Sequence, residues 1–202
     1  MIVVTSKIVA LAENRTAIIE NAQTKEKMIR AESELVMRTK YVWLTVKDGM
    51  VMASAGIDES NANGKLILLP KNSFKTAGFL RNKLRRYYGV KDLGVLITDS
   101  RTLPLRAGIT GVALGYAGFR GVKDYRDTPD LFGRKYTFSR TDVADSLATT
   151  AVFVMGEGSE QQPLAIIEKA PIEFCDKIHR RELHIDIQKD MYQPLFSKLS
   201  KR

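Results

Sequence analysis

Apolar runs typical of β-strands are connected in two different ways along this chain. Residues 41–46 and 50–53 flank Lys47, Asp48 and Gly49, and a short connection containing Asp-Gly between two such runs is typical of a β-hairpin. Other runs, such as residues 66–69 and 93–98, are separated by a segment with helical periodicity. Hairpins make antiparallel pairs, whereas strands joined through a helix are commonly parallel. The sequence therefore predicts a mixed α+β fold rather than a regular doubly wound sheet.

The remaining elements follow from local start and stop signals. We expect a strand over residues 2–10 and a charged helix over residues 25–38. A second helix over residues 73–88 would be capped by Ser73 and ended by Gly89. Ser139 and Asp142 have the spacing of a capping box, which predicts a third helix over residues 143–155. A polar loop at residues 156–162 and a strand at residues 164–167 complete the predicted core.

Two carboxylates each follow an apolar run directly. Asp58 comes after residues 50–57, and Asp99 comes after residues 93–98 with Ser100 next to it. A carboxylate at the end of a buried strand is held rigidly, and hard divalent cations take oxygen ligands of this kind. Asp and Ser also end strands as ordinary turn formers. On spacing alone the turn interpretation is favoured, and the metal interpretation stays open beside it.

Two glycine-containing segments each allow two interpretations. The small, apolar residues 108–118 permit close approach of a backbone or a ligand, and a tightly packed strand bulge is an equally favoured interpretation of their composition. Gly156 and Gly158 follow a predicted helix, where an ordinary C-terminal cap is the stronger interpretation. The alternative is a backbone cradle for phosphate, with Glu157 reaching a metal ion. The sequence contains neither a P-loop motif nor a G-x-G-x-x-G motif followed by a helix.

The charge balance and the metal-binding residue types restrict the partners. The formal net charge is +9, which suits nucleic acid, nucleotides or phosphorylated metabolites, or else a solvated basic surface. Residues 81–86 form a basic cluster without an aromatic-interleaved RNA-binding motif, so we expect nucleotides rather than nucleic acid. One Cys and two His leave an oxygen-bound ion, Mg, Mn or Ca, as the expected metal. The single Cys and the lack of a span-length apolar run predict a cytoplasmic protein without membrane contact.

Seven short motifs occur along residues 1–168 in one order. They are Val3-Val-Thr-Ser-Lys-Ile-Val-Ala-Leu-Ala-Glu13, Ala55-Gly-Ile-Asp-Glu-Ser-Asn61, Thr98-Asp-Ser100, Gly108-Ile-Thr-Gly-Val-Ala-Leu-Gly115, Asp130-Leu-Phe-Gly-Arg134, Val143-Ala-Asp-Ser-Leu-Ala148 and Val154-Met-Gly-Glu157. This order resembles the coenzyme F-420-0:L-glutamate ligase family (CofE-like gamma-glutamyl ligase). The resemblance predicts one ligase domain over residues 1–170, with a charged C-terminal tail over residues 171–202.

The resemblance implies an activity and an assembly. Such ligases use GTP and a divalent metal, Mg or Mn, to form an amide between L-glutamate and a carboxylate acceptor, coenzyme F-420-0 or a related compound. The acceptor carboxylate becomes an acyl phosphate, which the glutamate amine attacks; positioning and charge neutralisation supply most of the catalysis of phosphoryl transfer. The family has its own mixed-sheet α+β fold and forms an intertwined homodimer, and two metal ions are expected.

The resemblance also implies roles for particular residues. Asp58 and Asp99 would hold one metal ion, and Ser100 and Glu157 a second. Arg106 would contact the substrate. The expected nucleotide-binding residues are Ser6, Lys7, Asn61, Val154, Met155, Gly156, Gly158, Ser159 and Glu160.

The sequence departs from the family pattern at several places. From the resemblance we expect a nucleotide-binding segment of the family to be missing before Met1, and Leu11 stands where the family often has a basic residue. After Ser100, residues 102–106 lack the family's Trp. These departures predict slow glutamyl transfer with poor nucleotide affinity, and they leave two alternatives open. One is a catalytically impaired family member that binds nucleotide and metal, and the other is a basic nucleic-acid-binding module.

Overall fold

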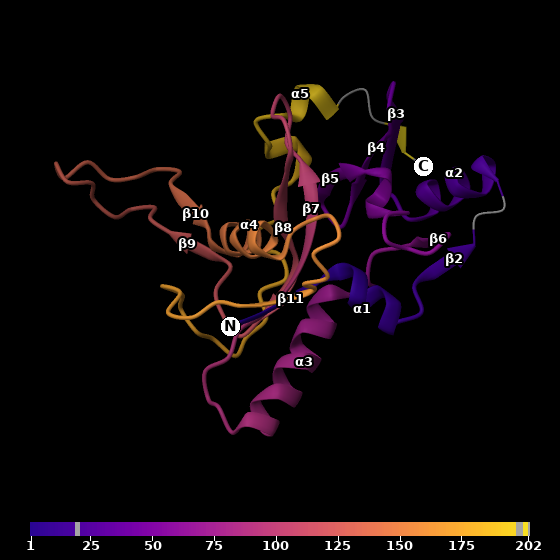
Figure 1. Cartoon of the computed structure of the whole chain (residues 1–202). Coiled ribbons are helices and arrows are strands. Elements are labelled where there is room, and N and C mark those ends of the chain that lie inside the picture. The colour runs from indigo at the N-terminus through magenta and orange to yellow at the C-terminus, as the bar shows by residue number, and fades with distance from the viewer. Residues whose placement is uncertain (19–20, 197–199, 202) are drawn as a thin grey trace. The chain divides into compact units, whose positions relative to one another are not determined.

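The computed structural model describes residues 1–18, 21–196 and 200–201, and its elements are labelled in Figure 1. The chain divides into two compact units, each built from two separate stretches of sequence. The first unit contains Met1–Ser6 and Asn72–Leu183, and the second contains Lys7–Lys71 and His184–Arg202. We describe each unit by itself.

The first unit is built on a mixed four-stranded sheet. Its elements are β1 (Ile2–Thr5), α3 (Ser73–Tyr88), β7 (Val95–Thr102), β8 (Ile109–Ala117), β9 (Val122–Asp124), β10 (Arg140–Asp142), α4 (Val143–Met155) and β11 (Leu164–Ile166). The strand order is β11-β1-β7-β8. The β1–β7 pair is parallel, whereas β11 and β8 pair antiparallel with their neighbours. The predicted α+β class is therefore confirmed, because one sheet contains both kinds of pair.

A bulge in β8 lets helices pack on both faces of this sheet. Ile97 pairs with Gly115 and Thr98 pairs with Ala113, so Leu114 is an extra residue without a partner in β7. Such a residue reverses the alternation of side chains along a strand. A Cβ on Gly111 would lie 2.4 Å from the Ala148 carbonyl oxygen in α4, and a Cβ on Gly115 would lie 2.5 Å from the Phe74 backbone nitrogen in α3. The glycine-rich segment therefore allows two helices to approach the strand closely.

The second unit contains two smaller sheets. Its elements are α1 (Ser6–Ala12, beginning with the last residue of the first unit), β2 (Thr16–Ile18), α2 (Ala22–Ala31), β3 (Leu35–Arg38), β4 (Trp43–Lys47), β5 (Met50–Ala53), β6 (Lys65–Ile67), α5 (Gln193–Phe196), β12 (Ser200–Lys201) and the 3-10 helices η1 (Ser54–Gly56) and η2 (Ile187–Lys189). The strand orders are β12-β3-β4-β5 and β2-β6. The predicted hairpin is confirmed as β4–β5, with positive φ at Asp48 (51°) and Gly49 (74°), as a tight hairpin turn requires.

Two sequence predictions about the elements were wrong. The strand predicted over residues 2–10 ends at Thr5, and α1 begins at the next residue, Ser6. A short apolar run can have the same composition in a strand and in a helix, so composition did not distinguish them. The helix predicted over residues 25–38 ends at Ala31, and β3 follows it. The hydroxyl of Ser33 donates to the Ile29 carbonyl at 2.6 Å, which satisfies one of the last carbonyls of α2.

The helix caps also lie at other residues than predicted. Asn72, rather than Ser73, accepts the Lys75 amide at 2.9 Å at the start of α3. Asp142, rather than Ser139, accepts the Asp145 amide at 2.9 Å at the start of α4. In both cases the side-chain oxygen accepts from the third residue after it, as expected of an N-cap. The predicted stop of α3 at Gly89 is confirmed by its left-handed φ of 64°.

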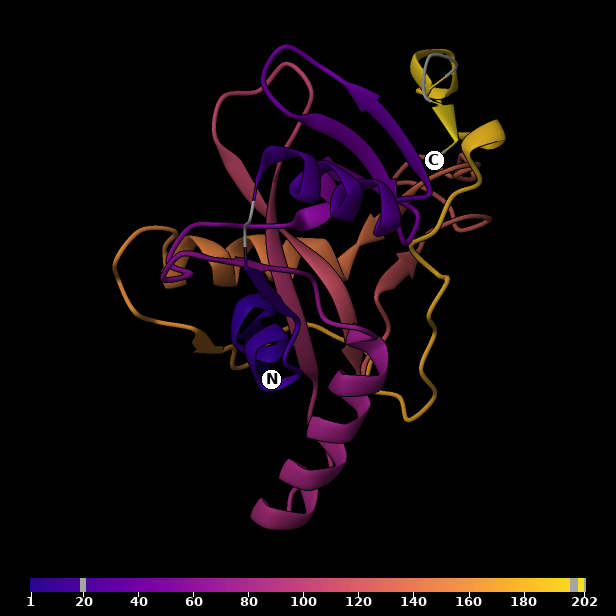
Figure 2. The same ribbon diagram turned by 90° about the vertical axis from the view of Figure 1, so that its right-hand side faces the viewer.

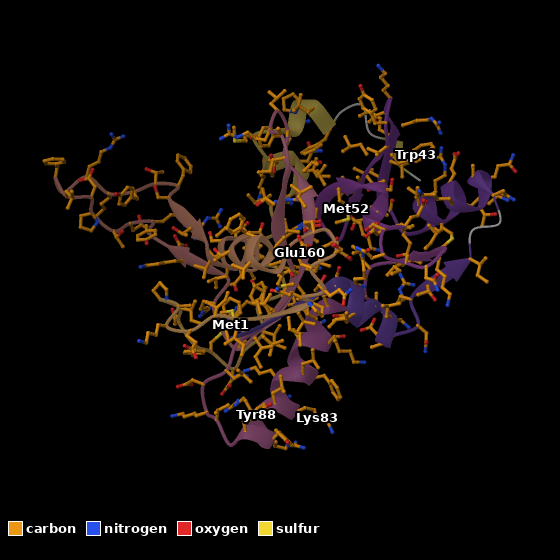
Figure 3. The ribbon with its side chains drawn as sticks, in the orientation of Figure 1. Met1, Trp43, Met52, Lys83, Tyr88 and Glu160 are labelled. Atoms are coloured by element: carbon orange, nitrogen blue, oxygen red, sulfur yellow. The ribbon has the colours of Figure 1, made fainter. Side chains whose placement is uncertain are left out.

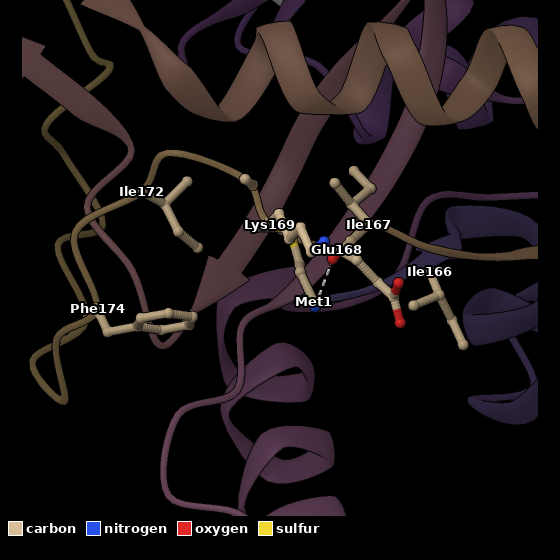
Figure 4. A pocket seen from close by; sticks show the side chains of 8 residues that line it. Met1, Ile166, Ile167, Glu168, Lys169, Ile172 and Phe174 are labelled. Carbon is tan, nitrogen blue, oxygen red and sulfur yellow. Dashed lines mark hydrogen bonds between the residues drawn. The ribbon is translucent and has the colours of Figure 1, made fainter.

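Residues 171–183 belong to the first unit and contact its other segments. The Cys175 amide donates to the Gly118 carbonyl at 3.0 Å, and the Tyr116 hydroxyl donates to the Glu182 carboxylate at 2.7 Å. Burial and then the Glu182 carboxylate raise the pKa of Tyr116 well above its usual value. A neighbouring hollow has a volume of about 450 Å³ and is lined by Met1, Ile166, Ile167, Glu168, Lys169, Ala170, Ile172 and Phe174. Figure 4 shows the side chains that line it.

Residues 122–142 form an arm that leaves the sheet of the first unit, as Figure 1 shows at the left. β9 and β10 pair antiparallel at its base. Leu131 and Phe132 are 97% and 95% exposed. Among the described residues, no helix is long and apolar enough to cross a membrane.

Candidate functional site

Parallel pairing brings Asp99 to Ser6 in the first unit. Thr5 at the end of β1 pairs with Thr98 in β7, so the next residues along the two strands are Ser6 and Asp99. The Ser6 hydroxyl, which is nearly buried, donates to Asp99 Oδ1 at 3.1 Å. Asp99 lies inside β7 rather than at its end, because β7 continues to Thr102. A predicted nucleotide-binding residue is thus in contact with a predicted metal ligand.

A second predicted pair also meets in the first unit. Ser100 lies on β7, and Glu157 lies just after α4. The Ser100 hydroxyl donates to Glu157 Oε2 at 3.2 Å. Residues 57 positions apart in the sequence therefore place a hydroxyl and a carboxylate oxygen side by side. These are the two residues that the resemblance assigns to the second metal ion.

The loop after α4 already binds one anionic oxygen. Gly156 has φ 79° and ends the helix, so the interpretation as a C-terminal cap is confirmed. The Glu160 carboxylate, labelled in Figure 3, turns back and accepts the Gly158 amide at 2.7 Å. Met155 is 5% exposed and packs in the core, whereas Val154 is exposed. Backbone amides that take a carboxylate are also suited to phosphate oxygens.

Asp58 has its own set of partners in the second unit. It follows η1 rather than β5, and its backbone pairs with Ile67 through hydrogen bonds of 2.9 and 2.8 Å. Its carboxylate accepts the Ser60 amide at 2.7 Å and the Ser60 hydroxyl at 2.8 Å, and it forms an ion pair with Lys7 at 2.7 Å. Burial opposes ionisation, yet the hydrogen bonds from Lys7 and Ser60 hold the pKa of Asp58 below its usual value.

Lys7 and Asn61 complete this group. The Lys7 ammonium also donates to the Ser60 carbonyl at 2.8 Å and to the Ser60 hydroxyl at 3.1 Å. Asn61 has φ 49°, a left-handed conformation that Asn tolerates in turns. Sequence reasoning missed Ser60. Its signal was the spacing Asp-x-Ser, because an Asp side chain commonly accepts from the backbone amide two residues later.

The oxygen donors in each unit are of the type that Mg and Mn prefer. Asp99, Glu157, Ser6 and Ser100 supply carboxylate and hydroxyl oxygens in the first unit, without thiolate or imidazole. The buried Thr98 hydroxyl next to Asp99 has no hydrogen-bond partner within the described part of the chain. The described residues contain no cluster of three or more His, Cys, Asp or Glu placed to hold a metal. The type of these oxygen donors fits a hard cation.

Arg106 lies in the turn between β7 and β8. Its side chain is exposed, and its amide donates to the Leu103 carbonyl at 3.3 Å. Leu105 beside it is fully exposed with φ 57°. The structure therefore places Arg106 on an accessible turn of the first unit.

A model of the F420-0:Gamma-glutamyl ligase family matches residues 1–169. The chain belongs to this family. Coenzyme F420:L-glutamate ligase of Methanococcus maripaludis strain C7 is 41% identical over 136 residues, which are 67% of this chain and 54% of the relative. The protein of the same description from Methanopyrus kandleri is 40% identical over 142 residues, 69% of this chain and 56% of the relative. That from Haloarcula marismortui is 33% identical over 188 residues, 89% of this chain and 72% of the relative.

The extent of these matches is itself informative. The chain spans about half the length of the first of these gamma-glutamyl ligase relatives. The matched residues include every candidate site residue described above, from Ser6 to Glu160. The resemblance drawn from the seven sequence motifs is therefore confirmed at the level of the family.

Proposed function

We propose that this chain is a GTP- and divalent-metal-dependent ligase. It would join the amine of L-glutamate to the carboxylate of coenzyme F-420-0 or a related acceptor. The observation that carries the proposal is the family match over residues 1–169, which contains two oxygen pairs, Ser6–Asp99 and Ser100–Glu157, at hydrogen-bonding distance. The relatives from Methanococcus maripaludis and Haloarcula marismortui are coenzyme F420:L-glutamate ligases, which supports the same type of reaction here.

The reaction balances in two steps. An acceptor carboxylate oxygen attacks the γ-phosphorus of GTP, the bond to the β-phosphate oxygen breaks, and GDP leaves with the electron pair. The glutamate amine then attacks the acyl carbon of the acyl phosphate, the carbon–oxygen bond breaks, and phosphate and one proton are released. A bound Mg or Mn would neutralise the phosphate charge and orient the reacting oxygens.

The chain's own residues would mainly bind and orient the metal ions and the nucleotide. The oxygen ligands of two metal ions would come from Asp58, Asp99, Ser100 and Glu157, as the resemblance implies. The loop containing Gly156, Gly158 and Ser159 offers backbone amides to the nucleotide, and Glu160 would have to release the Gly158 amide for that purpose. Lys7 and Asn61 would contact phosphate near Asp58. Positioning and electrostatic stabilisation supply most of the rate in phosphoryl transfer, so no nucleophilic side chain is required.

The decisive experiment measures release of phosphate from GTP in the presence of Mn. We expect release that requires both glutamate and the acceptor and that falls at least a hundredfold in Ser100→Ala/Glu157→Gln. Cys175→Ser serves as the control, since that thiol lies outside the assigned site. Release independent of glutamate would contradict the ligase. Binding of GTP and Mn without any release would identify the chain as a catalytically impaired family member.

We also propose a homodimer in which the arm of residues 122–142 contacts a second copy. Leu131 and Phe132 are almost fully exposed, and exposed apolar side chains on a projecting segment commonly mark an association surface. We expect a mass near twice 22.7 kDa by light scattering. The variant Leu131→Ser/Phe132→Ser should shift it towards the monomer, whereas Ile18→Ser, at another exposed apolar residue, should not. A wild-type monomer at all concentrations would refute the proposal.

A further inference from the structure

One face of α3 carries exposed cations and aromatic rings in alternation. Lys75, Phe79, Lys83, Arg86 and Tyr87 are all exposed. Steps of three or four residues, from 75 to 79, from 79 to 83 and from 83 to 86 and 87, place them on one side of the helix. We call these five residues the α3 ridge. Figures 1 and 2 show the C-terminal half of α3 extending beyond the sheet of its own unit, and Figure 3 labels Lys83 and Tyr88 at that end.

The basic cluster recognised in the sequence is not the same set of residues. Arg81 is 6% exposed, donates to the Leu93 carbonyl at 2.8 Å and pairs with Asp176 at 2.7 Å. Arg85 pairs with the same carboxylate at 3.1 Å. Two of the cluster's cations therefore hold residues 171–183 against α3 and are not available to an external partner.

Unlike Arg81 and Arg85, the cations of the α3 ridge form no ion pair with a carboxylate in the part of the chain that the structure describes. The helix itself contains no acidic residue. The nearest Asp along the chain, Asp92, lies beyond the helix and next to Lys91. The Lys83 ammonium lies 5.7 Å from the centroid of the Phe79 ring, which puts a cation beside an exposed aromatic face. A ligand that combines planar rings with anionic groups would complement both features.

We propose that the α3 ridge binds single-stranded nucleic acid. Proteins that bind single strands without sequence preference combine cations along the phosphate backbone with aromatic side chains on which bases stack. Phe79 and Tyr87 are eight residues apart, or about 12 Å along the helix, and the cations lie on the same face. An anionic membrane would instead favour apolar residues gathered on one side and cations on the other. The interleaved pattern of the ridge favours the nucleic acid.

The test measures binding of a fluorescent 12-nucleotide RNA and its DNA counterpart to the full chain by anisotropy at several salt concentrations. We expect Phe79→Ala/Tyr87→Ala to weaken binding at least about tenfold, since each stacked base contributes strongly. We expect Lys83→Gln/Arg86→Gln to weaken binding. The slope of the logarithm of the binding constant against the logarithm of the salt concentration should become shallower by about 1.4, because each lost phosphate contact removes about 0.7 from it.

Matched control variants distinguish binding at the α3 ridge from non-specific attraction by the positive charge of the whole chain. Lys65→Gln/Lys71→Gln removes the same charge at exposed positions of the second unit, and Tyr41→Ala removes a ring that is 84% exposed. These variants should bind like the wild type. Circular dichroism should show every variant folded, and glutamate-dependent phosphate release should be unchanged in the ridge variants, because the inference is independent of the ligase proposal.

Three outcomes would overturn the proposal. The first is equal loss of binding in the ridge and control variants, which would indicate non-specific attraction by the net charge of +9. The second is binding to vesicles with anionic lipid, but not to RNA or DNA, that requires Phe79 and Tyr87. The third is a change of oligomer mass in Phe79→Ala/Tyr87→Ala, which would make the ridge a contact between copies of the chain.

Discussion

Lys7 and Asp58 form an ion pair in which the ammonium nitrogen lies 2.7 Å from Oδ2. The pair joins a residue expected to contact nucleotide to one expected to hold a metal ion. A cation bound at Asp58 must therefore share this carboxylate with an ammonium group, and the two positive charges repel each other. Lys7 should therefore weaken the binding of a metal ion at Asp58 and strengthen the binding of the nucleotide.

Replacing Lys7 should separate these two effects. In Lys7→Met we expect Mn to bind up to about tenfold more tightly, because a partly exposed ion pair contributes about 1 kcal/mol. GTP should bind more weakly, since a cation for its phosphates is lost. Titration calorimetry with each ligand measures both changes, and Lys25→Met, whose ion-pair partner is Glu59, is the control. A parallel change of both affinities would contradict the assignment.

Loss of the carboxylates should abolish metal binding while the fold remains. Asp58→Asn and Asp99→Asn each keep the shape of the side chain but lose the charge that a hard cation requires. We expect Mn binding to disappear from calorimetry in both variants, with unchanged circular dichroism. Asp48→Asn, in the exposed turn of the β4–β5 hairpin, should bind like the wild type. Unchanged Mn affinity in the first two variants would remove these residues from the site.

The second unit should lose stability in acid through Glu32. Its carboxylate, 20% exposed, accepts from Arg15 at 2.8 Å and Lys47 at 2.5 Å. Burial opposes ionisation, but the hydrogen bonds from Lys47 and Arg15 hold the pKa of Glu32 below its usual value. A lowered carboxylate pKa stabilises the folded state at neutral pH, and this contribution is lost as the pH falls below about 4.

Denaturant unfolding followed by the fluorescence of Trp43, the single tryptophan, reports on this unit. Glu32→Gln should lower the free energy of unfolding at pH 7 by about 1–3 kcal/mol and should weaken its dependence on acid. Glu26→Gln breaks only the more exposed helical pair with Arg30 at 3.0 Å, so it should cost about 0.5 kcal/mol or less. Equal losses in the two variants would be inconsistent with this account.

The glycines of β8 should tolerate no side chain. A methyl group on Gly111 or Gly115 would overlap backbone atoms of α4 or α3, which cannot move as a flexible side chain can. We expect each of Gly111→Ala and Gly115→Ala to lower the free energy of unfolding by about 1–3 kcal/mol and to reduce the protection of β8 amides from hydrogen exchange. Ile109→Ala, at a half-exposed position of the same strand, is the control. Wild-type stability in both glycine variants would refute the close packing.

Local signals in the sequence predicted the parts of the fold that are decided locally. The hairpin at Asp48-Gly49 and the end of α3 at Gly89 follow from backbone conformations that few residues adopt. The contacts of the candidate site are different, because Ser6 and Asp99 are 93 residues apart and meet only through the parallel pairing of β1 with β7. The glycine-rich composition of residues 108–118 left a strand bulge open as an interpretation, but it did not locate the bulge at Leu114, on which the alternation of side chains in β8 depends.

The family resemblance supplied what spacing alone could not. Asp58 and Asp99 were better explained as turn formers from the sequence pattern, and it was the order of seven motifs that assigned them to metal ions. The burial of Arg81 against Asp176 was not predictable either, because its partner lies 95 residues further along the chain. An arginine in a basic cluster gives no sign of which carboxylate will neutralise it.

Mass spectrometry of the product tests the central claim most directly. The full chain is incubated with GTP, Mn, L-glutamate and coenzyme F-420-0, and with other carboxylates in parallel. We predict that one acceptor gains the mass of a glutamyl residue, that the gain requires GTP, and that it is absent with Asp99→Asn. An acceptor mass unchanged under all conditions, although the wild-type chain binds GTP and Mn, would contradict the assignment of glutamyl ligase activity to this chain.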